Sequence, residues 1–337
     1  MELALPCPLD AGWELVRTVV LPKRGADGSP LGGFSAAAYQ PELDRLWLLS
    51  DAPRGHLIPW SGLSQLLNGQ STTLHPGPRL LLRDGFGHPL PEGFDGEGLV
   101  LVDNNNSAWI ASEGRRTPDR LARLIRIDIN TGRQKRVLQL PPSWREISGR
   151  GLAANQGPES LTALAPSELL LAAERPLLQS IDPLLVPMAR VNQGAAVRPE
   201  STLQIQPLAE GAGLTELLAL PAQRKLLALV RGFQPPLTWS AQLLLFPYPS
   251  GSDTPPPLQP VHVGICLQLV CRQTIGRPWP LVQSCVMVAP RWYWGVTTTS
   301  TRASQAGSRS WLLAAPKPVP TNLPASGGQL IPFFVQR

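Results

Sequence analysis

The stretch from Asp95 to Glu113, DGEGLVLVDNNNSAWIASE, constrains the fold of this chain most strongly. An acidic segment leads into a short apolar run (98–102), a polar turn of Asp103 and three asparagines follows, and a second apolar run ends on another acid. Apolar runs joined by a turn of aspartate and asparagine are typical of a β-hairpin. The sequence therefore predicts a hairpin with a carboxylate at each end.

Similar hairpins recur along the chain. Their first positions are 62, 62 and 57 residues apart: Ser35, Glu97, Glu159 and Glu216. Their closing positions follow after 16, 16, 15 and 14 residues: Asp51, Glu113, Glu174 and Val230. A period near 60 made of short strands and polar turns favours a β-propeller over a helical solenoid. We expect an all-β propeller of about five to six blades, with an irregular C-terminal tail.

Composition agrees with many short strands. Thirty-eight prolines and 30 glycines interrupt the 337 residues every few positions, which disfavours long helices. The apolar runs, such as 80–82 and 243–245, are too short to cross a bilayer, so we expect no transmembrane segment. The four cysteines have no paired spacing typical of a disulfide framework or a zinc site.

The net charge of +6 would ordinarily suggest an anionic partner, but its distribution argues against one. Residues 255–337 contain seven of the 30 basic residues and no Asp or Glu. The first 254 residues therefore carry 23 basic and 24 acidic side chains. This near-neutral body predicts no nucleic-acid partner, and we expect a monomer that binds a small substrate.

Several phrases resemble a known family. DGEGL followed by WIASEG, NQGPESL followed by LLLAAERPL, and GLTELLAL followed by LLALVRGF are similar to the phytase-like propeller family, named for an esterase-like activity of phytase. The resemblance covers about residues 30–235. It implies a hydrolase of phosphoric or carboxylic esters, with calcium as cofactor. The sequence departs from the family at Val230, where a glutamate is expected before Arg231.

The repeats offer a set of carboxylates for such chemistry. The predicted metal ligands are Asp51, Asp95, Glu97, Glu113, Glu159 and Glu216. The predicted catalytic residues are Glu97, Glu113, Glu159 and Glu174. In a propeller, equivalent strand ends face one funnel, and Ca²⁺ takes six to eight oxygen ligands. A bound Ca²⁺ would polarise the ester and activate a water. The alternative is that each acid is a turn residue facing water.

Three arginines next to these acids are candidates for binding the substrate: Arg115, Arg175 and Arg231. Arginine suits phosphate because its planar fork donates two parallel hydrogen bonds. The alternative for the basic cluster from Arg115 to Arg126 is a solvated loop and a strand in which Arg126 and Asp128 face water. For Glu174 and Arg175 the alternative is a structural salt bridge.

Other classes of function are less well supported. The chain has no G-x-S-x-G elbow and no H-E-x-x-H motif, so we expect hydrolysis without a protein nucleophile. His56, five residues after Asp51, could face the same funnel or form an ordinary hydrogen bond in a loop. A propeller can also be a non-catalytic module that binds a ligand or a protein, and fold alone does not separate the two.

The start and the end of the chain leave further questions open. The first residues lack a secretory signal pattern. The family resembled here is commonly exported, so we expect a periplasmic or secreted protein if the start is truncated and a cytoplasmic one otherwise. The period predicts a fifth hairpin near residue 277, where none is present. We divide the chain into a phytase-like propeller (1–254) and an acid-free tail (255–337).

A stretch as long as this tail would ordinarily carry roughly ten acidic residues. We hypothesise that the tail is read in a shifted frame and is poorly ordered. When the codons over 263–302 are re-read in another frame, they permit a peptide that resembles the family's last hairpin. Sequencing of an independent clone of the locus tests this hypothesis.

Overall fold

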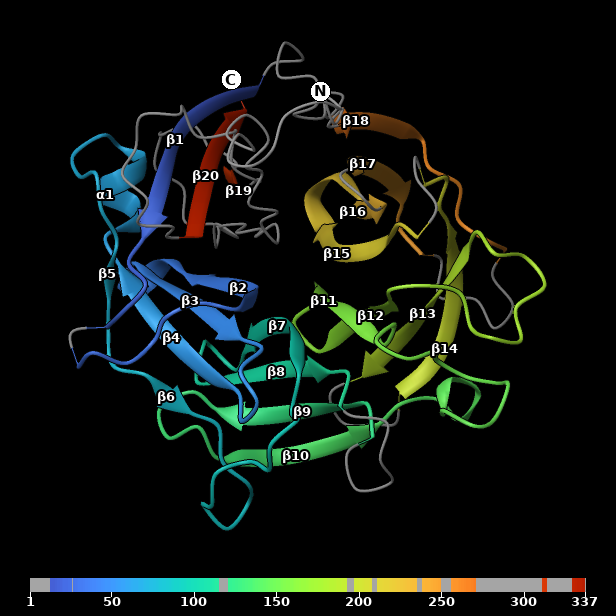
Figure 1. The fold of residues 1–337 in the computed structure, drawn as a ribbon, viewed down its shortest axis with the longest axis horizontal. Helices are drawn as coiled ribbons and strands as arrows, with labels where there is room; N and C mark the ends of the chain where they lie inside the picture. Colours follow the sequence, from blue (N-terminus) through green and yellow to red (C-terminus); the bar gives the residue numbers. More distant parts are fainter. Residues whose placement is uncertain are drawn as a thin grey trace, which may run out of the picture.

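The computed structural model describes residues 13–25, 27–114, 121–192, 197–207, 211–234, 238–249, 256–270, 311–313 and 329–336. These residues form five antiparallel sheets around a common centre (Figure 1). Four of the sheets are blades of four or five strands, each built from one continuous region of the chain. The predicted all-β propeller is therefore confirmed.

The first blade contains β2 (Phe34–Gln40), β3 (Arg45–Ser50), β4 (His56–Ser61), β5 (His75–Pro76) and β6 (Leu80–Leu81). The second contains β7 (Gly96–Val102), β8 (Ser107–Ser112), β9 (Arg123–Asp128) and β10 (Gln134–Gln139). The third contains β11 (Pro158–Ala165), β12 (Glu168–Ala173), β13 (Leu185–Asn192) and β14 (Val197–Gln204). The fourth contains β15 (Gly213–Leu220), β16 (Lys225–Gln234), β17 (Thr238–Pro247) and β18 (His262–Val270).

The fifth sheet joins the two ends of the chain. In it, β1 (Trp13–Leu21) pairs with β20 (Gln329–Gln336), which pairs with β19 (Trp311–Leu313). The expected five to six complete blades are thus not found in the described part of the chain, which forms four blades and this three-stranded sheet. The helices are short: α1 (Leu63–Leu67) and 3₁₀ turns at Pro41–Leu43, Pro142–Trp144 and Pro221–Gln223.

The first strand of each complete blade lies closest to the centre (Figure 1). β2 contacts β7, β7 contacts β11, and β11 contacts β15. Each inner strand pairs antiparallel with the second strand of its own blade, which gives the four predicted hairpins. In the second blade, Asp103, Asn104 and Asn105 all have positive φ angles of 51–64°. Aspartate and asparagine tolerate this backbone region better than most residues, so they suit the tight turn.

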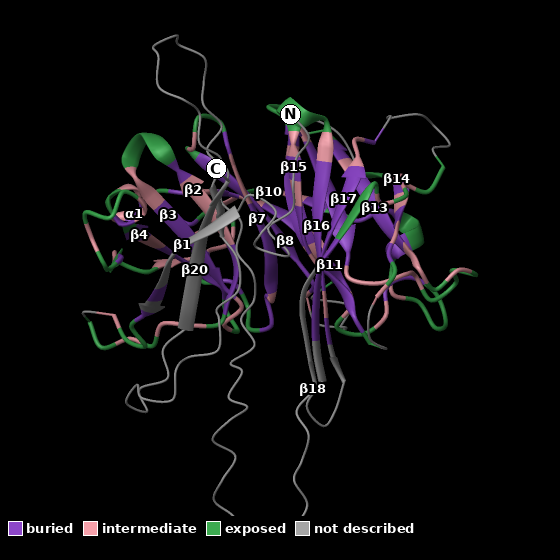
Figure 2. Cartoon of the chain, turned by 90° about the horizontal axis from the view of Figure 1, so that it is seen from above, coloured by how far each residue is buried: buried purple, intermediate pink, exposed green. Residues whose placement is uncertain are grey.

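The core lies between the blades. One apolar cluster joins the first and second blades, another the second and third, and another the third and fourth. A fourth cluster packs β1 against the first blade and α1. Because a blade has neighbours on both faces, its middle strands are buried on both sides, and all six residues of β8 are buried. Figure 2 shows this burial along the strands and the exposed loops at their ends.

The structure describes only part of the predicted tail. β18 lies beyond residue 254 and pairs with β17 along the edge of the fourth blade. Residues 271–310 and 314–328, on which much of the reading-frame hypothesis rests, lie outside the described residues. The division at residue 254 and the shifted frame stay predictions. Among the helices that the structure describes, none is long and apolar enough to span a membrane.

Candidate functional site

A one-residue irregularity occurs near the start of each inner strand. The strand register shifts at the extra residue of each of these strands: Ser35, Glu97, Glu159 and Thr215. A β-bulge of this kind changes the direction of a side chain and is common at functional sites. The predicted opening positions are therefore confirmed in three blades and wrong by one residue in the fourth, where Thr215 takes the place assigned to Glu216.

The same register corrects the closing position of the fourth hairpin. Leu214 pairs with Val230 as Gly96 pairs with Ser112, so the residue equivalent to Glu113 is Arg231. Thr215 and Arg231 are 16 residues apart, the same spacing as Glu97 and Glu113. The fourth blade thus has an arginine where the first three have an acid, and Val230 is a buried core residue.

Glu113 links the second blade to the third. Its backbone N–H donates to the Asp95 carbonyl at 2.9 Å, while its side-chain Oε1 accepts a hydrogen bond from the Gly157 N–H at 2.6 Å. The side chain is 7% exposed. A hydrogen bond from the backbone fixes the orientation of the carboxylate. The glycine of the NQG phrase therefore has a structural reason, since it lets the chain approach the acid closely.

Glu174 has the equivalent place between the third and fourth blades. Its backbone N–H donates to the Gly157 carbonyl at 2.9 Å, and its own carbonyl accepts from the Leu214 N–H at 2.8 Å. A Cβ atom at Gly213 would lie only 2.6 Å from Glu174 Oε1. A side chain at this position would force the Glu174 carboxylate to move, so glycine allows the close approach. Two of the predicted catalytic acids therefore also connect neighbouring blades.

A pocket of about 330 Å³ lies where the second and third blades meet. Three carboxylate residues line it together with the NQG segment: Asp95, Glu113, Glu146, Gly114, Ala153, Ala154, Asn155 and Gly157. The structure thus brings together two predicted residues, Asp95 and Glu113. It adds Glu146, which the sequence analysis missed because this residue lies between hairpins, just after the 3₁₀ turn that ends at Trp144.

A second pair of acids lies on the inner strands. Glu97 on β7 is 4% exposed and Glu216 on β15 is 8% exposed. Burial and the charge of Glu97 together raise the pKa of Glu216 to about 8, although the hydrogen bond from the Leu217 N–H acts in the opposite direction. Because β11 lies between β7 and β15, this interaction acts between the second and fourth blades. Near neutral pH the Glu216 carboxyl is mostly protonated.

The remaining predicted acids do not line the Glu113 pocket. Asp51 closes the first hairpin and its side chain lies against Gly33 of the same blade. Glu159 is half-buried on the bulge of β11. Glu174 forms an ion pair with the adjacent Arg175, with Oε1 3.6 Å from Nε. The predicted acids are thus distributed over the pocket, the inner strands and the ends of the blades, and their convergence on one cavity stays a prediction.

Two of the predicted substrate-binding arginines lie near the junction of the third and fourth blades. Arg175 is engaged with Glu174, and Arg231 lies opposite Gly213 in the fourth blade. Arg115 lies outside the described residues. His56 is buried at the start of β4, the third strand from the centre, and burial together with the charge of Arg79 lowers its pKa to about 4. A neutral histidine in that place packs inside the blade and does not face the funnel.

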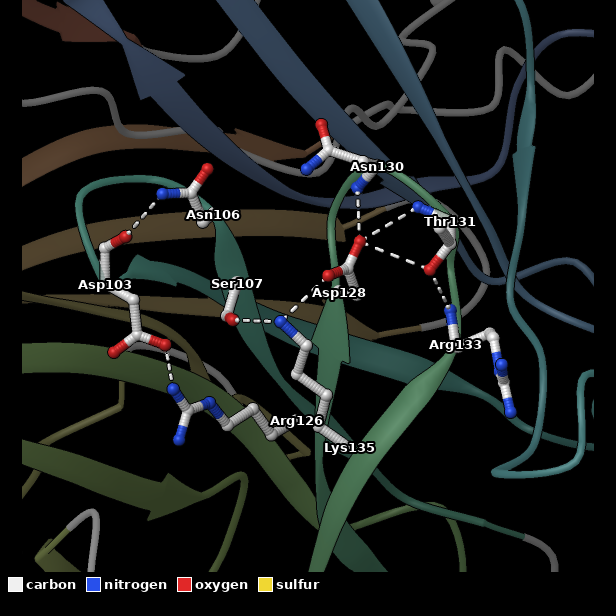
Figure 3. A network of polar contacts seen from close by, with 9 residues as sticks. All are labelled: Asp103, Asn106, Ser107, Arg126, Asp128, Asn130, Thr131, Arg133 and Lys135. Carbon is white, nitrogen blue, oxygen red and sulfur yellow. Dashed lines mark hydrogen bonds and ion pairs between the residues drawn. The ribbon is translucent and has the colours of Figure 1, made fainter.

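The charged side chains on the turns of the second blade contact one another (Figure 3). Arg126 forms an ion pair with Asp103, and Lys135 with Asp128 at 2.8 Å. Asp128 also accepts hydrogen bonds from the backbone N–H groups of Asn130 and Thr131. The expectation that Arg126 and Asp128 simply face water is therefore wrong. Their charges are balanced within the blade, far along the strands from Glu113.

The predicted Ca²⁺ would need a cluster of oxygen ligands. Ca²⁺ needs about six to eight oxygen ligands within roughly 2.6 Å. Over the residues that the structure describes, no group of three or more His, Cys, Asp or Glu side chains is close enough to hold a metal ion. The acids of the pocket are therefore neighbours without being a ligand cluster. Calcium stays a prediction, and no chemical step below depends on it.

Comparisons with solved structures found low overall similarity. The chain is similar to the β-propeller domain of Cps50 (Swd1) from Myceliophteria thermophila, with 11% identity, 70% of this chain and 72% of that chain covered, and a TM-score of 0.34. It is also similar to the Neurospora crassa Pan2 WD40 domain, with 13% identity, 71% and 53% covered, and a TM-score of 0.36. It thus spans about half of that second chain.

A chain of the mitotic checkpoint complex gives 9% identity, 75% and 68% covered, and a TM-score of 0.35. Similarities at this level say nothing about function. No curated protein matches this chain. The family model described as phytase-like, "esterase-like activity of phytase", matches residues 29–265, which is more than half of the sequence. This chain therefore belongs to the phytase-like family of β-propellers.

Proposed function

We propose that this protein hydrolyses a phosphoric or carboxylic ester in the pocket between the second and third blades, by attack of water. The supporting observation is Glu113, a nearly buried carboxylate that the Gly157 N–H holds at 2.6 Å on the wall of the pocket. The volume of this pocket, about 330 Å³, is near the lower end of the range for pockets that bind small molecules. Membership of the phytase-like family supports the same class of reaction.

The proposed role of Glu113 is that of a general base. A carboxylate in a fixed position can remove a proton from a water as that water attacks the carbonyl carbon or the phosphorus of an ester. The bond from that atom to the leaving oxygen then breaks, and the leaving oxygen takes up a proton from solvent or from a neighbouring acid.

The test compares hydrolysis of p-nitrophenyl phosphate and p-nitrophenyl acetate by the wild type, Glu113→Gln and Glu97→Gln, with and without added Ca²⁺. We expect Glu113→Gln to lose about 10²- to 10⁴-fold in rate, the usual size of a general-base effect. Glu97 does not line the pocket, so Glu97→Gln is expected to keep most of the activity. Circular dichroism shows whether each variant folds, because Glu113 also links two blades.

The opposite pattern, with Glu97→Gln inactive and Glu113→Gln active, would move the centre to the inner strands and overturn the assignment to the pocket. Stimulation by Ca²⁺ would support the predicted cofactor. The other predicted catalytic acids, Glu159 and Glu174, enter the same assay as glutamine variants.

A second candidate is a non-catalytic propeller that binds a ligand or a protein. It is favoured by the contacts of Glu113 and Glu174 with the backbone of the following blade, which give both acids a purely structural use. Absence of hydrolysis of either ester by a correctly folded wild-type protein would support this candidate. Size-exclusion chromatography with light scattering would test the expected monomer.

A further inference from the structure

The strand β9 begins with Arg123, which has no acidic partner among the residues that the structure describes. Arg123 is half-buried, and its backbone lies opposite Ser112 of β8 and Gln139 of β10. Among the described residues, no carboxylate forms an ion pair with its guanidinium. Burial lowers the pKa of the Arg123 guanidinium. A charge that is partly removed from water is costly unless a counter-charge compensates for it.

Some other half-buried arginines are paired with acids, whereas Arg45 lies over the ring of Trp47 and Arg83 donates to the Gly87 carbonyl. Arg126 forms an ion pair with Asp103. Arg190 forms ion pairs with Glu168 and Glu200, both at 2.6 Å. These pairs show the ordinary arrangement for a buried guanidinium, in which the protein supplies the anion. Arg123 differs from them. An unbalanced, partly buried charge in a cleft is typical of a position where a ligand supplies the missing charge.

Arg123 lines a small pocket of about 10 Å³ together with Phe94, Ser112 and Gly114. This volume accommodates about one water-sized group, such as a single oxygen atom of an oxyanion. Gly114 is also part of the wall of the larger pocket that contains Glu113. The small pocket that Arg123 lines is therefore adjacent to the candidate site for ester hydrolysis, and Gly114 is common to both.

We propose that Arg123 forms an oxyanion subsite, which receives a phosphate or carboxylate oxygen of a ligand bound at the Glu113 pocket. The planar fork of arginine donates two parallel hydrogen bonds to such a group. The three acids of the larger pocket would by themselves repel an anionic ester, and Arg123 offsets part of this repulsion. This inference rests on the proposed function and narrows the substrate to an ester that carries an anionic group.

Binding of inorganic phosphate and of acetate, measured by isothermal titration calorimetry, tests the subsite without requiring turnover. The variants are Arg123→Gln, which removes the charge, and Arg123→Lys, which keeps the charge and loses the fork. Arg133→Gln is the matched control, because Arg133 is an exposed arginine at the β9–β10 turn of the same blade. Circular dichroism confirms that each variant is folded.

We expect Arg123→Gln to weaken phosphate binding about tenfold or more, the equivalent of losing one charge-assisted contact. Arg123→Lys should lie between this variant and the wild type, and Arg133→Gln should bind as the wild type does. Tighter binding of phosphate than of acetate indicates a phosphoryl group as the natural anion, and the reverse order indicates a carboxylate. Equal binding by the wild type and Arg123→Gln, or no binding of either anion by the wild type, overturns the subsite.

The two proposals can fail separately. Arg123-dependent binding of phosphate without hydrolysis of either ester would leave the subsite standing and remove the hydrolase. Hydrolysis that depends on Glu113, together with anion binding that does not depend on Arg123, would support the hydrolase and remove the subsite.

Discussion

The two acids on the inner strands make the stability of this protein depend on pH in a defined direction. Burial raises the pKa of Glu216 from its ordinary value of 4.5 to about 8, and the charge of Glu97 adds to the effect. The folded protein therefore holds this proton more tightly than the unfolded chain does. The resulting stability is fully present below pH 4.5 and is lost as the pH rises to about 8.

The magnitude follows from the size of this shift. Between the two pKa values, each pH unit changes the free energy of unfolding by about 1.4 kcal/mol for one such group. From about pH 5.5 to about pH 7.5, the contribution of Glu216 should fall by about 2 to 3 kcal/mol. The substitution Glu216→Gln keeps the shape of the side chain and removes its titration. The variant should therefore lack this part of the pH dependence.

Urea unfolding at several pH values measures the effect as a difference between the wild type and Glu216→Gln. A difference is needed because His56 also titrates in both proteins. Its pKa is lowered from 6.5 to about 4, so its contribution makes the stability rise as the pH increases between these two values. Glu92→Gln is the control, since Glu92 is an exposed acid that pairs with Arg54 at 3.5 Å. If the curves of the wild type and Glu216→Gln run parallel over the whole range, the assignment of Glu216 as a buried, protonated acid is wrong.

Three further predictions concern the contacts between and within blades. Gly213→Ala should destabilise the fold by about 1 to 3 kcal/mol, because the added Cβ would lie 2.6 Å from Glu174 Oε1. Gly85→Ala is the control and should cost less, because its Cβ would have no atom closer than 3.9 Å. Equal melting temperatures of the two variants would contradict this prediction. Trp109→Ala, which empties a fully buried position between the second and third blades, should cost about 3 to 5 kcal/mol in chemical denaturation, and a loss below about 1 kcal/mol would mean that this core is not packed as described. Arg126→Gln should change stability by about 1 kcal/mol or less, because a partly exposed ion pair contributes little. A loss several times larger in the same assay would show that the contact between Arg126 and Asp103 organises the blade.

The sequence determined the local elements of this protein. Apolar runs on both sides of the DNNN turn fix the hairpin of β7 and β8, because turn residues and strand-forming side chains act over a few neighbours. The same signals located the hairpins of the other three blades. The reason for glycine at Gly157 and Gly213, the close approach of Glu113 and Glu174, appears only in three dimensions.

Tertiary structure decided which side chains meet. A bulge adds one residue to a strand without a mark in the sequence, so the fourth hairpin was aligned on Glu216 when Thr215 and Arg231 occupy the equivalent positions. The approach of Glu97 to Glu216, the presence of Glu146 in the pocket and the unpaired charge of Arg123 depend on how blades pack. Packing between blades joins residues that are far apart in the sequence, such as Glu113 and Gly157, which are 44 positions apart, and burial shifts the pKa of groups such as Glu216. No local pattern carries that information.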